Sequence, residues 1–535
     1  MAILKYTASA DNTIVNAFQS NLTTRGTGSN AGAADILEAY SIYGRAMAPS
    51  ASNTSGSQEL SRILLQFPIT DISADRTAGK IPTSGSVNFY LKMYNAETSK
   101  TVPRDFSLEV LPIAQTWQEG VGLDLENYKD LTKGNIGSNW LYATKTTLWT
   151  RPDSGTAVGG AFLTGTADPQ FKQTFESGLE DLEVDISPLV EHWIAGTKTN
   201  YGVGIMLSSS YEAYYSSSND TSTTQEPYTG SIINNTGGAT DSYYTKRFFG
   251  RGTEFFFKKP VIEARWDSSK RDGRGDFYFS SSLAPAADNL NTLYLYNYIR
   301  GRLRNIPAVG STGSIMVSLY SGSSTNLAAS GSKLLLYNGG TAVTGGYVST
   351  GIYSCSIAVT GTTSNLSTLY DVWWSGSGAD PSTANTEFFT GSILTKAFGA
   401  TTNTREPTYY INITNLQNRY SSKETARFNL YVRNKYWSPN IYTKAQKTPE
   451  HFPVVSASYR VFRILDALEA VPHNTGSDFA TGLSYDVSGN YFDFSMKLLD
   501  PGYEYGFKFS FYDDELSSWL EQDEIFKFRV VNNEY

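Results

Sequence analysis

"DISPLVEHWIAGTKTNYGVGIML", residues 185–207, joins a short helix to a strand, and this pairing decides how the N-terminal part of the chain folds. Five apolar residues recur here at the spacing of one helical face: Ile186, Leu189, Val190, Trp193 and Ile194. A helix of two turns is marginal by itself and has to be held by packing against a sheet. We therefore predict a two-turn helix with one buried face.

Residue types also predict where this helix starts and stops. Ser187 is placed to cap it, Pro188 suits the first helical position, and Gly196 suits the left-handed residue that ends it. The strand predicted over residues 200–207 points three apolar side chains inward: Val203, Ile205 and Leu207.

Composition extends this interpretation to the whole chain. The 535 residues exceed what one hydrophobic core can organise. The 36 Tyr, 28 Phe and 46 Gly, with few runs of helix-forming residues, favour strands and turns. We predict an all-β protein of tandem β-sandwich domains, the first of which contains one short helix, within residues 185–196.

Periodicity and turn clusters divide the chain into four segments. A period-two strand over residues 86–94, with Val87, Phe89, Leu91 and Met93 on one face, belongs to a first β-sandwich at residues 1–215. Residues 216–245 are polar and aperiodic and are predicted to be a linker or long loop. Evenly spaced strands predict an immunoglobulin-like sandwich at 246–404. Tyr353 lies two positions before Cys355, as in a tyrosine corner, but Cys355 has no partner cysteine and is expected to be a buried residue of a strand. A C-terminal sandwich follows at 405–535.

Three further stretches resemble a known module. "LSRILLQFPITDI" (60–72), "TWQEG" (116–120) and "TLWTRP" (147–152) precede the Trp-ended helix and the Asn-Tyr-Gly strand in the order found in DNRLRE-type modules. The resemblance covers roughly residues 1–210. It implies a jelly-roll β-sandwich of the carbohydrate-binding kind for the first domain.

An insertion separates this chain from that family. Residues 121–146 stand between Trp117 and Trp149, where the family usually has a short link. A ligand surface there would be covered or remodelled, so sugar binding is not directly inherited. Trp117, Trp149 and Trp193 are expected in the core, which leaves Trp140 and Tyr142 as the residues most open to ligand binding.

The rest of the chain resembles a different class of protein. Residues 247–279, 426–440 and 483–511 are similar in style to virion structural proteins of contractile-tailed marine bacteriophages. This resemblance implies a non-enzymatic component of a particle. It also implies that the partners are other virion proteins and that the chain assembles in the host cytoplasm.

Reactive groups are scarce in this sequence. The carboxylates Glu119, Asp124 and Glu126 could mimic a glycosidase pair, but a charged, solvated loop is the commoner cause of such a cluster. No metalloprotease motif, nucleophile elbow or Cys–His pairing is present, and the only histidines stand in unrelated contexts: His192, His451 and His473. We therefore predict no catalytic residues and no enzyme.

The sequence also predicts neither a metal site nor a receptor-binding motif. The single Cys355 excludes a cysteine-rich metal site, and Asp486 and Asp493 lack the ordered ligands of a calcium loop, so a hairpin turn is preferred and no metal or cofactor is predicted. Residues 274–276 spell Arg-Gly-Asp, which we interpret as a turn before a strand.

Charge is weak overall but uneven along the chain. With 43 Lys and Arg against 51 Asp and Glu, the net charge of −8 predicts neither nucleic-acid nor membrane binding. Residues 246–304 hold twelve basic and six acidic residues, whereas 500–524 hold eight acidic residues and one Lys. Opposite patches favour a homo-oligomer with Arg300, Arg302 and Arg304 at the interface, and independent solvated faces are the alternative.

These observations lead to one expected function and one alternative. We expect a non-enzymatic virion structural protein of a tailed bacteriophage, in the capsid, neck, tail or baseplate. The alternative is a carbohydrate-binding surface adhesin or receptor-binding module that recognises a host surface glycan.

Overall fold

The computed structural model describes most of the chain. It covers residues 2–18, 26, 28–45, 56–99, 102–123, 137–151, 155–215, 233–278, 285–322, 332–360, 366–375, 386–396, 409–438, 440–441, 451–514 and 516–532. In these ranges the fold is all-β with two short α-helices, which confirms the predicted class of tandem β domains. The chain divides into two compact units, Ala2–Trp266 and Asp267–Tyr535.

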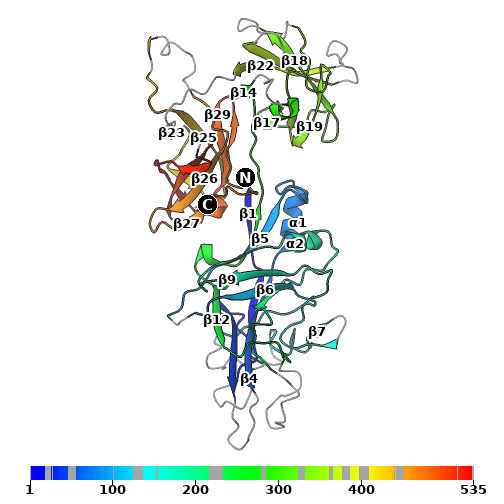
Figure 1. Ribbon diagram of the computed structural model, residues 1–535, viewed down its shortest axis with the longest axis vertical. Helices are drawn as coiled ribbons and strands as arrows, with labels where there is room; N and C mark the ends of the chain where they lie inside the picture. The colour runs from blue at the N-terminus through cyan, green and yellow to red at the C-terminus, as the bar shows by residue number, and fades with distance from the viewer. Residues whose placement is uncertain are drawn as a thin grey trace, which may run out of the picture. The chain divides into compact units, whose positions relative to one another are not determined.

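Two antiparallel sheets build the first unit (Figure 1). The smaller has the strand order β1 (Ile3–Thr7), β13 (Val261–Arg265), β5 (Asn88–Met93), β10 (Leu182–Asp185). The larger has the order β12 (Tyr243–Phe249), β3 (Ile36–Arg45), β4 (Gly56–Gln66), β11 (Val203–Leu207), β6 (Phe106–Pro112), β9 (Phe171–Phe175), with β2 (Ala10–Val15) also paired to β4. A separate two-stranded pair is formed by β7 (Thr150–Arg151) and β8 (Gly155–Thr156).

Strand β5 shows how the period-two pattern fixes a strand in the smaller sheet. The four residues predicted to share one face, Val87, Phe89, Leu91 and Met93, are all buried. The intervening residues are half-buried and carry the polar side chains. The prediction for this strand is confirmed.

Helix α2 (Ser187–Ile194) explains why a helix interrupts the β-structure. It buries Leu189, Val190 and Trp193, and it connects β10 of the smaller sheet to β11 of the larger one. Figure 1 shows it beside β5, and the Ile186 amide donates to the Phe89 carbonyl at 2.8 Å. The helix is therefore the crossing between the two sheets.

The structure confirms the predicted C-terminal end of α2 but not the predicted cap at its start. Gly196 has a φ of +70°, the left-handed conformation expected after the helix. The Ser187 hydroxyl, however, makes no capping hydrogen bond. It donates to Asp185 Oδ1 at 2.5 Å and accepts the Phe89 amide at 2.7 Å, so it ties the helix start to β5.

A second helix, α1 (Ile69–Thr77), was not predicted. Only Ile72 of its nine residues is buried, so its sequence carries no apolar stripe. It packs beside α2, where the Arg76 guanidinium donates to both carboxylate oxygens of Glu191 at 2.6 and 2.7 Å. The expectation of one short helix was therefore wrong.

The first unit is longer than predicted. Strand β12 pairs with β3, and β13 lies between β1 and β5. The expected boundaries at 215 and 246 therefore fall inside this unit, which ends at Trp266. Pairing between strands so distant in sequence leaves no local signal.

One seven-stranded sheet forms the first part of the second unit, in place of the expected immunoglobulin-like pair of sheets. Its order is β14 (Phe277–Tyr278), β22 (Thr386–Lys396), β21 (Thr368–Ser375), β18 (Ile315–Gly322), β19 (Val343–Ser349), β20 (Ile352–Ile357), β15 (Asn291–Tyr296). The sheet curls around one core that joins Phe277, Leu293 and Trp373, and Cys355 is buried there as predicted.

Two facing sheets form the rest of the second unit. The orders are β23 (Tyr409–Ile413), β25 (Thr425–Asn434), β29 (Gly489–Ser495), β28 (Ser484–Asp486), and β24 (Arg419–Ser421), β32 (Phe526–Val531), β30 (Glu504–Asp513), β26 (Ala457–Arg463), β27 (Glu469–Val471), with β31 (Ser518–Glu521) on β30. Phe428 and Phe492 of one sheet contact Phe507 of the other, with ring centroids 4.8 and 5.2 Å apart. This aromatic core packs between the two sheets, and the bounds predicted for a C-terminal sandwich, 405–535, stay a prediction.

Both units also contain short elements between the longer strands. Strands β16 (Tyr298–Ile299) and β17 (Arg302–Leu303) form a hairpin between β15 and β18. In the described part of the chain, three single 3-10 turns also occur: Phe256–Lys258, Ala286–Asn289 and Met496–Leu498.

Candidate functional site

Trp140, one of the two predicted ligand-binding aromatics, lies in the core. Its ring has no exposed surface, and the Arg62 guanidinium lies over it, 5.4 Å from the ring centroid. A ring in this position cannot stack on a ligand, so the prediction for Trp140 was wrong. Tyr142 is half-buried and forms an isolated bridge with Leu148, and its ligand-binding role stays a prediction.

The other tryptophans of the first unit are structural, as predicted. Trp117, Trp149 and Trp193 are all buried. The Trp117 indole donates to the Tyr201 carbonyl and the Trp149 indole to the Asn139 carbonyl, each at 2.8 Å. Their polar atoms are thus used inside the unit.

The arginine of the "LSRILLQF" stretch has an equally internal role. Arg62 donates to both carboxylate oxygens of Glu212, at 2.9 Å from Nη2, and to the Gly159 carbonyl at 2.9 Å. The two side chains are only 6% and 7% exposed. This buried ion pair joins β4 to the segment after β11.

The Asn-Tyr-Gly signature has a backbone explanation. Asn200 donates to the Phe67 carbonyl at 2.8 Å and accepts the Gly202 amide at 3.0 Å. Gly202 has a φ of +86°, and a Cβ there would lie 1.9 Å from the Leu65 carbonyl oxygen. Only glycine fits where β11 enters the sheet beside β4.

Glu119, the carboxylate considered for catalysis, is held in an ion pair. Arg251 donates to both of its oxygens at 2.8 and 2.9 Å, and the Asp11 amide donates to it at 2.9 Å. Burial, with the nearby Glu119 charge, raises the pKa of Asp11 to about 6. Asp124 and Glu126 lie outside the described residues, so the structure assembles no glycosidase pair from the residues it describes.

Each of the three histidines has a partner inside the fold, and His473 Nε2 also lies 3.5 Å from Glu521 Oε2. His192 Nδ1 lies 2.8 Å from Thr197 Oγ1, and His451 Nε2 lies 3.0 Å from the Val487 carbonyl. His473 is more enclosed than its sequence context suggested, with Ser458 and Ser510 hydroxyls 3.3 and 3.0 Å from its two nitrogens. Burial lowers its pKa below the usual value.

The Arg-Gly-Asp and Asp-rich stretches are structural. Arg274 forms ion pairs with Asp272 and Asp371, and its side chain is 9% exposed, so the tripeptide is not presented to a receptor. Asp486 pairs with Gly489 at the β28–β29 hairpin, as predicted, and Asp493 pairs with Arg427 at 2.8 Å. In the part that the structure describes, no cluster of three or more His, Cys, Asp or Glu could hold a metal ion.

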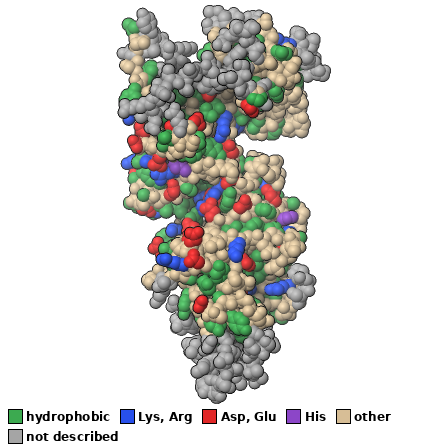
Figure 2. All heavy atoms as spheres, viewed as in Figure 1, with side chains coloured by type: hydrophobic (Ala, Val, Ile, Leu, Met, Phe, Trp, Pro, Cys, Tyr) green, Lys and Arg blue, Asp and Glu red, His purple; other side chains and the backbone are tan. Residues whose placement is uncertain are grey.

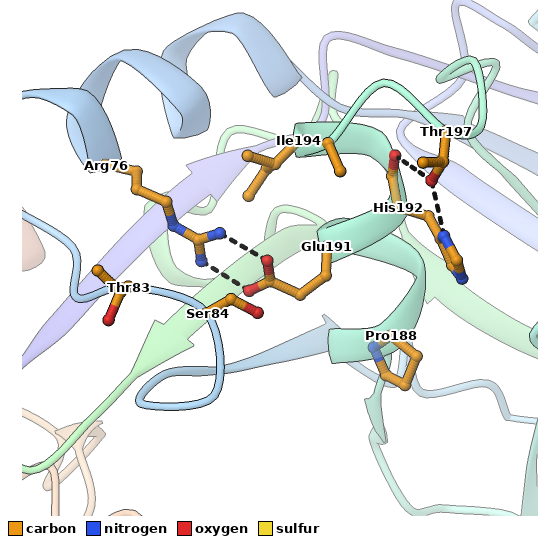
Figure 3. Close-up of a pocket in the computed structure, with 9 residues that line it drawn as sticks. Arg76, Thr83, Ser84, Pro188, Glu191, His192, Ile194 and Thr197 are labelled. Atoms are coloured by element: carbon orange, nitrogen blue, oxygen red, sulfur yellow. Dashed lines mark hydrogen bonds and ion pairs between the residues drawn. The ribbon is translucent and has the colours of Figure 1, made fainter.

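A hollow of about 600 Å³ lies beside the two helices. Figure 3 shows two of its lining residues, Arg76 from α1 and Glu191 from α2, joined by their ion pair, with His192 turned toward Thr197. Its lining contains no Trp, Tyr or Phe, so it lacks the aromatic face on which sugar rings stack. The ion pair and the hydrogen bond use its main polar groups internally.

The basic segment 246–304 does not form one surface. Lys246 is 2% exposed, and its ammonium donates to Asn95 Oδ1 and to the Gly178 and Glu180 carbonyls. Arg251, Arg265 and Arg274 are in ion pairs. Figure 2 likewise shows acidic and basic side chains interspersed on the face drawn, not a field of one sign.

The β16–β17 hairpin carries the three predicted interface arginines. Its turn residues Arg300 and Gly301 have φ of 52° and 73°, the type I′ geometry that matches strand twist. Asn297 fixes its base by donating to the Arg304 carbonyl at 2.7 Å. A left-handed arginine costs about 1 kcal/mol or more, a strain that tends to persist where a side chain is used.

Exposure and missing partners set this hairpin apart. Arg300, Arg302 and Arg304 are exposed, and no ion pair or hydrogen bond engages their guanidinium groups among the described residues. Tyr298 and Ile299 beside them are 56% and 46% exposed. We call these five residues the arginine hairpin: aromatic and aliphatic surface framed by arginines is the composition of protein interfaces.

Comparisons with known proteins add no family. No protein-family model matches the chain, and no curated protein matches it. The site assignment therefore rests on geometry and chemistry alone.

Within the described ranges, neither helix has the length and apolar character needed to cross a membrane.

Proposed function

We propose that this chain is a non-enzymatic structural component of a tailed-bacteriophage particle that works by docking on other virion proteins. The observation that supports it best is the arginine hairpin, where exposed Tyr298 and Ile299 lie beside three arginines whose guanidinium groups have no partner among the residues that the structure describes. Such a surface suits contact with another protein, because it combines apolar area with guanidinium donors. The phage assignment itself comes from the sequence resemblance.

The side chains first considered for chemistry support the same proposal. Glu119 is neutralised by Arg251, His192 and His451 contact neutral oxygen groups, and His473 lies between two serine hydroxyls and the Glu521 carboxylate. A general acid or base must reach a substrate, whereas these side chains are occupied by contacts inside the protein. The chain acts as a scaffold on this proposal.

The carbohydrate-binding alternative finds less support. The four tryptophans considered for sugar stacking are buried, and the hollow beside the helices lacks an aromatic face. Of the aromatic candidates, only Tyr142 retains partial exposure. No described surface favours a glycan over a protein partner.

The proposal is tested on particles. Infectious phage from a lysate that carries this gene is banded on a density gradient, and the protein content of the band is measured by quantitative mass spectrometry. We expect the chain at a fixed copy number per particle that survives a second banding. A chain found only in the soluble fraction would contradict the structural role.

A further inference from the structure

A second surface of the chain complements the arginine hairpin. The turn between β30 and β31, together with β31 and the link to β32, exposes Asp514 and Asp523 and partly exposes Glu524. Leu516, Leu520 and Ile525 stand among them and are 52%, 36% and 43% exposed. We call these six residues the acidic strip.

The charges of this strip are not used elsewhere in the described structure. Its neighbour Glu521 is engaged by Arg460 and Lys508 at 2.6 and 2.7 Å and so contributes little outward charge. No described residue forms an ion pair with Asp514, Asp523 or Glu524. Three carboxylates therefore remain to meet a cation.

We propose that the arginine hairpin of one copy docks on the acidic strip of a second copy, a contact that rests on the structural function proposed above. Three guanidinium groups face three carboxylates, and Tyr298 and Ile299 face Leu516, Leu520 and Ile525. A specific interface usually has apolar residues in the middle and paired charges around them.

The match of sign and number favours a second copy over an unrelated partner. Each chain carries both surfaces, so every copy offers one donor and one acceptor surface. Two different patches in contact make a head-to-tail interface, which closes into a ring or continues as a row, whereas a two-fold dimer would bring identical patches together. Arginine is the cation suited to such contacts because its planar fork binds carboxylates through two hydrogen bonds.

The test uses the full chain in sedimentation velocity at low salt. The parent is expected to form concentration-dependent assemblies that dissolve as salt is raised, because exposed charges are screened. Arg300→Glu/Arg302→Glu/Arg304→Glu and Asp514→Lys/Asp523→Lys/Glu524→Lys should each sediment as monomers. An equal mixture of the two variants should assemble again, since each reversed surface meets an opposite one.

A matched control separates this contact from a general effect of charge. Lys145→Glu/Lys172→Glu/Lys497→Glu changes the net charge by the same amount as the hairpin variant at three other exposed positions, and it should assemble like the parent. Circular dichroism confirms that every variant is folded.

Several results would overturn the inference. A parent that stays monomeric at low salt, a strip variant that still assembles, or a mixture that fails to assemble would each remove the second copy as the occupant. If the hairpin variant were absent from particles while the strip variant was incorporated normally, the hairpin would bind a different virion protein. That result would support the structural function and reject the contact between two copies of the chain.

Discussion

Removing the charge of Glu212 should cost the first unit much of its stability. Glu212 accepts three hydrogen bonds from Arg62, and both side chains are nearly unexposed. Glu212→Gln keeps the shape but leaves the guanidinium charge buried without compensation. Breaking a buried pair in this way costs about 3–5 kcal/mol, a large share of the roughly 5–15 kcal/mol that stabilises a domain.

Hydrogen–deuterium exchange on the full chain gives the measurement, because it reports each unit separately. We expect the protection of β4 and β11 amides to fall by roughly two to four orders of magnitude in Glu212→Gln. Arg62→Met/Glu212→Leu, which removes both charges, should lose less than the single variant.

Asp493→Asn serves as the exposed control for this prediction. It breaks a pair with Arg427 whose side chains are 49% and 32% exposed, and it should change protection by about 1 kcal/mol or less. If the free energy of opening of Glu212→Gln lay within about 0.5 kcal/mol of the parent's, breaking this ion pair would not leave an uncompensated buried charge, and the reasoning would be wrong.

Three further predictions concern the first unit. Trp140→Ala should lower its unfolding free energy by about 3–5 kcal/mol, while Tyr142→Ala should change it far less, both read from urea denaturation. Lys5, Lys92 and Arg265 outweigh the effect of burial and hold the pKa of Glu263 at about 2, below its ordinary 4.5. The stability from Glu263 is therefore present above pH 4.5 and lost as pH falls toward 2, about 3 kcal/mol in all, and Glu263→Gln should flatten that pH profile. Gly202→Ala should cost at least about 1–2 kcal/mol and expose the β4–β11 amides, and a neutral result would mean that β11 enters the sheet by another path.

Local features of the fold could be predicted from sequence because they depend on near neighbours. The alternation around Phe89 and the helical stripe through Trp193 each describe one element against one buried face. Helix α1 was not predicted because Ile72 is its only buried residue, which leaves no apolar stripe. The pairing of β13 with β1 was not predicted because the two strands are some 250 positions apart in the sequence.

The candidate site shows the same division. The exposed arginines were predicted from a local excess of charge, but sequence could not show that Arg251 and Arg274 are paired while Arg300 is not. Trp140 was assigned to a surface because it lies in an insertion, and the structure instead places it under Arg62. Partners brought together by the fold decide which polar side chains remain free.

The pairing of β1 with β13 also governs how the polypeptide is made and dissected. Strand β1 has its sheet neighbour at Val261–Arg265, so this sheet stays incomplete until translation has passed Arg265. A recombinant fragment that stops at residue 215 would lack both β12 and β13 and leave β1 and β3 with bare edges prone to aggregation. A cut after Trp266 retains both strands.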